Sequence, residues 1–276
     1  MELPTEPLIV IEPRKSWRLV NLSDFWSYRE LLYFLTWRDV KVRYKQTALG
    51  ATWAILQPLL LMLIFNFFFA RLAGIKSGNV PYPIFAYSGL LPWTFFATAV
   101  TNSGNSLIGN TNLITKVYFP RLIIPAAAVG AALVDLIIAF GLLVVLIIYY
   151  GINVTINLAL LPMLLVLLIV LALSVGLWMA ALNVKYRDVR YALPFLMQLW
   201  MFASPVVYPA SLVPEKWRLV IAINPMSGLI AAYRATLFGQ HLDVGSLAVS
   251  VVVTFAILIY SIHTFRRVET TFADVV

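Results

Sequence analysis

Few side chains in this sequence have the chemistry for catalysis or metal binding. The chain has no cysteine and two histidines far apart, His241 and His263. Disulfides, thiolate metal sites and iron–sulfur clusters are therefore excluded, and a histidine-rich metal centre does not fit. None of its seven lysines follows a glycine, so the chain lacks a Walker A loop for ATP. We expect no catalytic residue, no metal and no cofactor on this chain.

Asp135 is an ionisable residue within a long apolar segment, which is a costly place for a carboxylate. Two interpretations stay open. The side chain contacts a cationic group or a polar path, or it is a partnered, structural group that joins spans by hydrogen bonds. No second charge in a span forms a proton relay with it, which argues against an ion-coupled transporter. The absence of paired carboxylates argues against a membrane hydrolase or glycosyltransferase.

Basic residues alternate with aromatic ones just before the first apolar segment. Residues 23–46 place Tyr28, Leu31 and Leu35 at helical spacing, which predicts an amphipathic helix in the cytoplasmic interface. The alternative is a collar of snorkelling side chains around the first span. Four cations of this stretch are candidates for contact with a lipid diphosphate or anionic headgroups: Arg38, Lys41, Arg43 and Lys45.

The elements that must position these residues are membrane spans. Of the 276 residues, 62% are hydrophobic and 12% charged, whereas soluble domains are about half apolar and about a quarter charged. A span needs about 20 apolar residues. The sequence predicts an all-α integral membrane protein with six spans, near residues 52–70, 83–103, 122–150, 158–182, 191–208 and 244–263.

The basic residues predict how these spans are oriented. With the N-terminus inside, fifteen of the twenty basic residues are cytoplasmic, and five are external: Arg71, Lys76, Lys216, Arg218 and Arg234. Both termini are therefore expected in the cytoplasm, and the net charge of +8 reflects topology rather than nucleic-acid binding. The chain divides into a cytoplasmic segment (1–22), the interface helix (23–46), a six-span domain (47–265) and a cytoplasmic tail (266–276).

Two connecting segments have unusual composition. Asn102–Arg121 is too polar for lipid and too long for a tight turn, which predicts a short helix below the membrane. Pro209–Gln240 is broken by Asn224-Pro225, and the apolar stretch that follows is too short to span. We expect a re-entrant hairpin in the outer leaflet, with its irregular backbone covered by protein or facing a polar path.

Aromatic residues, 14% of the chain, gather near the predicted outer side. An interfacial aromatic belt is one interpretation. The other is a surface on which sugar rings stack, gated by the bulk of the hairpin. The residues predicted for this polymer path and gate are Phe65, Phe69, Trp93, Phe96, Tyr208, Met226 and Tyr233.

Three blocks in order carry a resemblance to a known family, which extends from about residue 25 over the rest of the chain. They are Trp37–Thr47 followed by Leu49-Gly50, Trp53 and Gln57-Pro58; Asn112–Arg121; and Arg187–Tyr191 with Pro194-Phe195 and Ser204-Pro205. This pattern resembles ABC-transporter permeases that export polysaccharides and polyol phosphates, of the O-antigen or capsule type. The alternatives are an ABC exporter of teichoic-acid-type polymers, or of a lipid or small molecule, and, more remotely, a membrane enzyme acting on lipid-linked sugars.

The resemblance implies a mechanism and a set of partners. Two copies of the chain pair with two ATP-binding subunits, which hold ATP and magnesium. A polysaccharide on a polyprenyl-diphosphate lipid crosses the bacterial cytoplasmic (inner) membrane between the two copies. The segments 107–116 and 184–190 dock the ATPase, and the coupling residues implied are Leu113, Ile114, Lys116, Tyr118, Arg187, Asp188 and Arg190.

Overall fold

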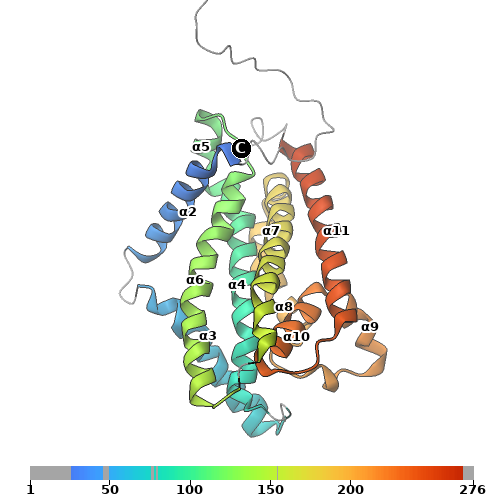
Figure 1. The fold of residues 1–276 in the computed structure, drawn as a ribbon. Coiled ribbons are helices and arrows are strands. Elements are labelled where there is room, and N and C mark those ends of the chain that lie inside the picture. Colours follow the sequence, from blue (N-terminus) through green and yellow to red (C-terminus); the bar gives the residue numbers. More distant parts are fainter. Residues whose placement is uncertain (1–25, 46–49, 76–77, 79, 154, 270–276) are drawn as a thin grey trace, which may run out of the picture.

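The protein forms a bundle of helices in a computed structural model that describes residues 26–45, 50–75, 78, 80–153 and 155–269 (Figure 1). No strand occurs within these ranges. The elements are α2 (Arg29–Tyr44), α3 (Thr52–Phe65), η1 (Asn66–Leu72), α4 (Tyr82–Gly109), α5 (Thr111–Lys116), α6 (Ile123–Tyr149), η2 (Ile156–Leu160), α7 (Leu161–Lys185), α8 (Val189–Phe202), η3 (Ala210–Leu212), α9 (Glu215–Ile223), α10 (Pro225–Phe238) and α11 (Val244–Glu269).

Five helices of the described chain are long and apolar enough to cross a membrane. They are Thr52–Leu72, Tyr82–Gly109, Ile123–Tyr149, Ile156–Lys185 and Val244–Glu269, and each overlaps a predicted span. The prediction of an all-helical protein with several spans is confirmed. At one end of the bundle, Arg121 Nη1 donates to Glu269 O over 2.6 Å, which brings the start of α6 to the end of α11. We call this the α5 end and the opposite one the α10 end (Figure 1).

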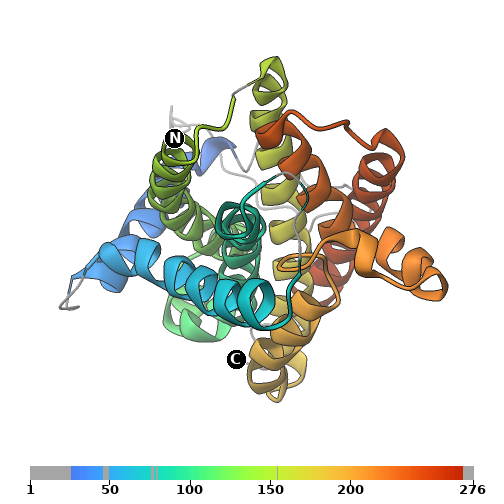
Figure 2. The ribbon, with the colours of Figure 1, turned by 90° about the horizontal axis from the view of Figure 1, so that it is seen from below.

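Helix α4 lies at the centre of the bundle. Figure 2 shows it end-on, with other helices around it, and it contacts α3, α6, α7, α8 and α10. In its most apolar window 78% of the residues are buried, against 17% to 44% for the other four. Its residues beyond Ser103 were predicted to form a separate short helix, but α4 continues to Gly109 before the short α5 begins. Asn105 and Asn110 donate to carbonyls one turn back, at Thr101 and Ser106, which accommodates amides within the helix.

The fifth predicted span is only partly helical. α8 has 14 residues, about 21 Å of helix, and ends at Phe202. Pro205 follows closely, and proline lacks the N–H that a continuing helix needs. Residues 203–208 form irregular turns that continue along α4, since Tyr82 Oη donates to Val207 O over 2.6 Å. The segment thus runs beside α4 towards the α10 end as a helix with an unwound end.

The next two helices form a sharp corner. α9 and α10 meet at Asn224-Pro225 and are bent by 90°. Asn224 caps α10 because its Oδ1 accepts from Met226 N over 3.1 Å, and Pro225 occupies the first turn. The bend agrees with the predicted break in Pro209–Gln240, while the dip into the outer leaflet stays a prediction.

Helix α2 follows α6 rather than standing apart from the bundle. Thr36 Oγ1 donates to Ala127 O, and two turns further on in α2, Arg43 reaches Asp135 of α6. Eight residues of α6 separate these contacts, about 12 Å along the helix. Residues 23–25 and 46 of the predicted interface helix, and the segments 1–22 and 270–276, lie outside the described residues.

Candidate functional site

Helix α5 and the extended segment after it carry part of the predicted coupling surface. Lys116 and Tyr118 are exposed. Ile114 is buried with Phe119 in a cluster that also contains Leu107 of α4, and Leu113 packs half-buried against it. Ile114 therefore anchors α5 to the bundle and does not itself lie on the exposed surface, while its role in coupling stays a prediction. The surface that remains for a partner is basic and aromatic.

The turn between α7 and α8 supplies the second part of that surface. Arg187, Asp188 and Arg190 are exposed, and the Arg190 guanidinium lies 4.6 Å from the ring centre of Tyr191. The turn lies at the α5 end because Asn183, near the end of α7, donates to Gly104 O over 2.9 Å. The same amide donates to Asn105 Oδ1 over 3.0 Å. The fold thus brings both predicted docking segments to one end of the bundle.

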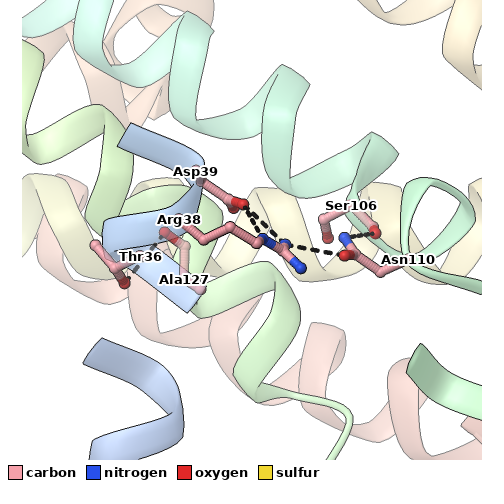
Figure 3. A network of polar contacts seen from close by, with 6 residues as sticks. All are labelled: Thr36, Arg38, Asp39, Ser106, Asn110 and Ala127. Carbon is pink, nitrogen blue, oxygen red and sulfur yellow. Dashed lines mark hydrogen bonds and ion pairs between the residues drawn. The ribbon is translucent and has the colours of Figure 1, made fainter. Parts of the chain in front are cut away.

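Arg38 joins α2 to the corner between α4 and α5 (Figure 3). Its Nη2 donates to Asp39 Oδ1 over 2.8 Å and to Asn110 Oδ1 over 2.9 Å, and its Nε donates to Asp39 over 3.0 Å. Asn110 in turn donates to Ser106 O over 2.8 Å. Arg38 was predicted to contact a lipid diphosphate, but its guanidinium is engaged within the protein because a carboxylate and an amide lie within reach.

Asp135 is a partnered carboxylate. Arg43 and Tyr44, both in the last turn of α2, donate to its two oxygens. Burial and the hydrogen bond to Asp135 raise the pKa of Tyr44 to about 12, so the phenol keeps its proton and donates. Arg43 was expected on a lipid diphosphate. Here it pairs with Asp135. Asp135 thus contacts a cationic group, as one interpretation has it, and joins α2 to α6, as the other has it.

Lys41 and Lys45 are the two exposed members of the predicted basic set. The Lys41 ammonium lies 5.7 Å from the ring centre of Trp37, and Lys45 follows directly after Tyr44. An exposed ammonium on a flexible stem can meet a phosphate as a point charge. Of the four predicted cations, these two are the exposed ones, whereas Arg38 and Arg43 are partly buried and pair with Asp39 and Asp135.

A pocket of about 370 Å³ opens beside the Asp135 contact. It lies between the end of α2, the start of α3 and the facing sides of α4 and α6. Its lining combines one acid–base pair, amides, hydroxyls and apolar walls: Arg43, Tyr44, Gly50, Trp53, Ala54, Gln57, Pro58, Thr94, Phe95, Thr98, Asn102, Ala132, Asp135, Leu136 and Ala139. Motif reasoning did not find this pocket, because its residues come from four segments of the sequence.

Trp93 and Phe96, predicted for the polymer path, lie in the interior of the bundle. Both are buried, and both pack against Trp200 of α8, with ring centres 6.5 and 5.2 Å away. Trp200 Nε1 donates to Asn224 Oδ1 over 3.0 Å, so the cluster connects α4, α8 and the cap of α10. In this structure the two rings offer no face to a glycan. Their indole and phenyl surfaces hold the helices together.

The other five residues predicted for the path and gate divide into two groups. Phe65, Met226 and Tyr233 are buried. Phe69 and Tyr208 are half-buried, and Tyr208 Oη donates to Phe202 O over 2.9 Å. Hydropathy does not distinguish a core-facing aromatic from an exposed one in a chain whose helices are apolar on most sides.

Arg234 of α10 is the functional candidate that motif reasoning did not single out. Its guanidinium is buried and donates to Pro205 O over 2.8 Å, to Phe85 O over 3.0 Å, to Val206 O, and to Ser88 Oγ over 3.4 Å. It also lies 3.7 Å from the Phe85 ring centre. All four acceptors are neutral oxygens, two of them from the unwound end of α8. The sequence signal was a lone arginine in an apolar stretch.

These features define a multi-pass membrane protein, with basic, exposed turns at one end and a bent helical hairpin at the other. Residues 30–238 match the family described as "ABC-2 type transporter". The chain belongs to the ABC-2 type transporter family, and this membership indicates a transporter rather than a catalyst.

Similar proteins are named as O-antigen export permeases or a polysialic acid transport protein, and the similarity covers most of their length. The O-antigen export system permease protein RfbA of Myxococcus xanthus is 34% identical over 260 residues, which cover 91% of this chain and 97% of that protein. A protein of the same name from Klebsiella pneumoniae is 27% identical, covering 89% and 95% of the two chains. The polysialic acid transport protein KpsM of Escherichia coli is 25% identical, covering 84% and 91%.

Proposed function

We propose that this chain is the membrane-spanning subunit of an ATP-driven exporter that moves a lipid-linked polysaccharide across the bacterial cytoplasmic membrane. The observation that carries the proposal is the similarity to an O-antigen export system permease, at 34% identity over 91% of this chain. The similarity to a polysialic acid transport protein supports the same class of cargo, a glycan polymer. Both termini lie in the cytoplasm, because this orientation places fifteen of twenty basic residues inside.

The complex contains two copies of this chain and two copies of a separate ATP-binding subunit, which holds ATP and magnesium. The missing Walker A loop supports this division of labour. The ATPase docks on the α5 end, where Lys116, Tyr118, Arg187 and Arg190 are exposed together. Ile114 and Leu113 pack α5 against the cluster that contains Leu107 of α4, so that a movement of the docked ATPase is transmitted to α4.

Cargo is recognised first through its lipid diphosphate. Lys41 and Lys45 supply the cations, because Arg38 and Arg43 are engaged with Asp39 and Asp135. The polymer then passes between the two copies of the chain. Among the residues expected on this path, Phe69 and Tyr208 carry partly exposed rings, and the buried aromatics support the wall behind them.

Charge reversal on the docking surface tests this function. Lys116→Glu and Arg187→Glu should abolish or strongly reduce glycan export in a strain deleted for the native chain, while the permease still inserts. ATP hydrolysis by the purified complex should no longer respond to the cargo lipid. The matched control is Lys216→Glu, an exposed lysine on α9 at the other end of the bundle. Wild-type export and ATPase association in both docking variants would contradict the assignment.

A further inference from the structure

The pocket beside Asp135 differs in its charge from a phosphate site. Arg43 and Asp135 are the ionisable acid and base in its lining, and they bind one another. Their charges cancel, so the lining has no net charge for a diphosphate, which favours uncompensated cations. The exposed Lys41 and Lys45 are not part of the lining. The ligand that fits the interior is therefore neutral.

The remaining polar lining both donates and accepts hydrogen bonds. Gln57 and Asn102 bring amides, each with donor and acceptor groups, from α3 and α4. Thr94 and Thr98 bring hydroxyls one turn apart on α4, and Thr94 Oγ1 donates to Leu91 O over 3.1 Å, which leaves its lone pairs as acceptors. Ligand hydroxyls, which donate and accept, match such a lining better than a carboxylate or an ammonium, which each do one.

Apolar surfaces complete the pocket. The Trp53 side chain is 48% exposed on one wall, and Phe95, Pro58 and Leu136 close the others. A volume of about 370 Å³ is at the small end of ligand pockets, which matches one or two sugar rings but not a polymer. Aromatic and aliphatic walls cover the C–H faces of such a ring, while the amides and hydroxyls meet its edges.

We infer that this pocket binds a single neutral, hydroxyl-rich sugar residue of the cargo, the one next to the lipid diphosphate. The inference rests on the proposed function and names a site within each copy of the chain. Lys45 comes directly after Tyr44, a pocket residue, so a diphosphate held by the exposed lysines of α2 has its attached sugar beside the opening. Each copy then binds the first sugar of the glycan before the polymer enters the path.

Cysteine protection tests the site, because the chain has no cysteine of its own. Single substitutions Thr98→Cys and Gln57→Cys place a thiol on two walls of the pocket, and Thr115→Cys, exposed on α5, is the control. The full complex with its ATPase is labelled with N-ethylmaleimide in native membranes. One set of membranes comes from cells that make the lipid-linked glycan. The other comes from cells in which the first sugar transfer to the carrier is blocked.

The inference predicts that both pocket thiols react several-fold more slowly when the glycan is present, while the control thiol reacts equally in both membranes. Equal, rapid reaction in both would overturn it, since the pocket would then hold only water. Equal, slow reaction in both would overturn it too, because the pocket would then be closed or filled whether or not the cargo is present. Two pocket positions on different helices guard against a variant that does not fold.

Export in the same strains separates this inference from the proposed function. Normal export with an unprotected pocket would remove the sugar site and leave the exporter standing, whereas export unaffected by deletion of the chain would remove both. A second variant pair uses shape-preserving changes. Thr98→Val should reduce export several-fold at limiting cargo, and Thr101→Val, on α4 outside the lining, should not. Equal export by the two variants would count against the pocket.

Discussion

Two arginines of the bundle are stabilised in different ways. Arg234, near the α10 end, is fully enclosed and gives its hydrogen bonds to backbone carbonyls and a serine hydroxyl. Arg43, on α2, is partly exposed and binds the carboxylate of Asp135. A buried charge without a counter-ion depends on every one of its dipolar partners. In a partly exposed ion pair, water also solvates the two charges. The first arrangement fixes a local structure, and the second can open at modest cost.

The difference follows from the backbone around each residue. α8 stops before Pro205, so the carbonyls of Pro205 and Val206 have no helical donor, and Arg234 supplies one. At Asp135 the helix α6 continues without a break, and the carboxylate would be the orphan without α2. Arg234 therefore completes an unwound segment, whereas Arg43 attaches one helix to another.

The largest effect is expected for Arg234→Met. The substitution leaves the carbonyls of Pro205 and Val206 without the donors of the guanidinium in the interior, at about 1–3 kcal/mol for each group. The variant should fail to accumulate or should melt far below the wild type, measured by fluorescence-detected size exclusion of heated membranes. Arg234→Lys should recover only part of the loss, because an ammonium lacks the planar fork. A methionine variant as stable as the wild type would remove the basis of the comparison.

Gly89→Ala should come next. An added Cβ would lie 2.3 Å from Val206 O and 2.5 Å from Arg234 Nη2, so the unwound segment or the guanidinium must shift. Overpacking of this kind costs about 1–3 kcal/mol. Gly141→Ala on α6 is the matched control, since its Cβ meets no atom within 4 Å. The thermal stability of both variants checks the expectation, and equal melting temperatures would show that the contacts between Gly89, Val206 and Arg234 are not tightly packed.

A smaller effect is expected at the other arginine. Asp135→Ala leaves the Arg43 charge unpaired but partly solvated, so about 1–2 kcal/mol should be lost. The double variant Arg43→Met with Asp135→Leu should lose less than the two single losses added together, because neither charge remains. A double-mutant cycle on melting temperatures measures the coupling. Strict additivity would mean that the two side chains do not interact in solution.

The smallest effect on stability is expected at Asp243. It is exposed and accepts from the hydroxyl and the N–H of Ser246 at the start of α11, bonds that hold its pKa below the usual value. A depressed folded-state pKa means that this stabilisation is present above about pH 4, the ordinary aspartate value, and is lost as the pH falls further through the folded pKa. Melting temperature against pH should fall slightly less steeply for Asp243→Asn than for the wild type. Identical curves would show that the cap contributes nothing.

Much of the fold was predictable because hydropathy reports burial in lipid directly. Thr52, Tyr150 and Val244 lie within a residue or two of observed helix ends, and the polar, proline-containing corner at Asn224 was also foreseen. The unwound end of α8 was not, since Pro194 inside α8 is tolerated whereas Pro205 ends the helix. Whether a proline ends a helix depends on which groups donate to the freed carbonyls, and that information lies in distant residues.

The site was less predictable than the fold. Arg43 and Asp135 lie 92 residues apart, and nothing in either local pattern indicates that they meet. Arg38 looked like a lipid-facing cation because its neighbours are aromatic, yet its partner Asn110 comes from the far end of α4. Trp93 looked like a surface aromatic because its segment lies near the predicted outer side, but the central position of α4 buries it.

The central position of α4 also bears on how the protein is made. Its most apolar window has a mean hydropathy of 1.3, whereas the windows of the other four long helices reach 2.0 to 3.0. A helix that is polar for a span partitions weakly into lipid on its own. Its neighbours α6 and α7 are synthesised later and are the strongly apolar ones. We therefore expect nascent α4 to stay beside the insertion machinery until α6 and α7 have been synthesised and pack against it. Helix α4 would then enter the lipid phase together with these two later helices rather than before them.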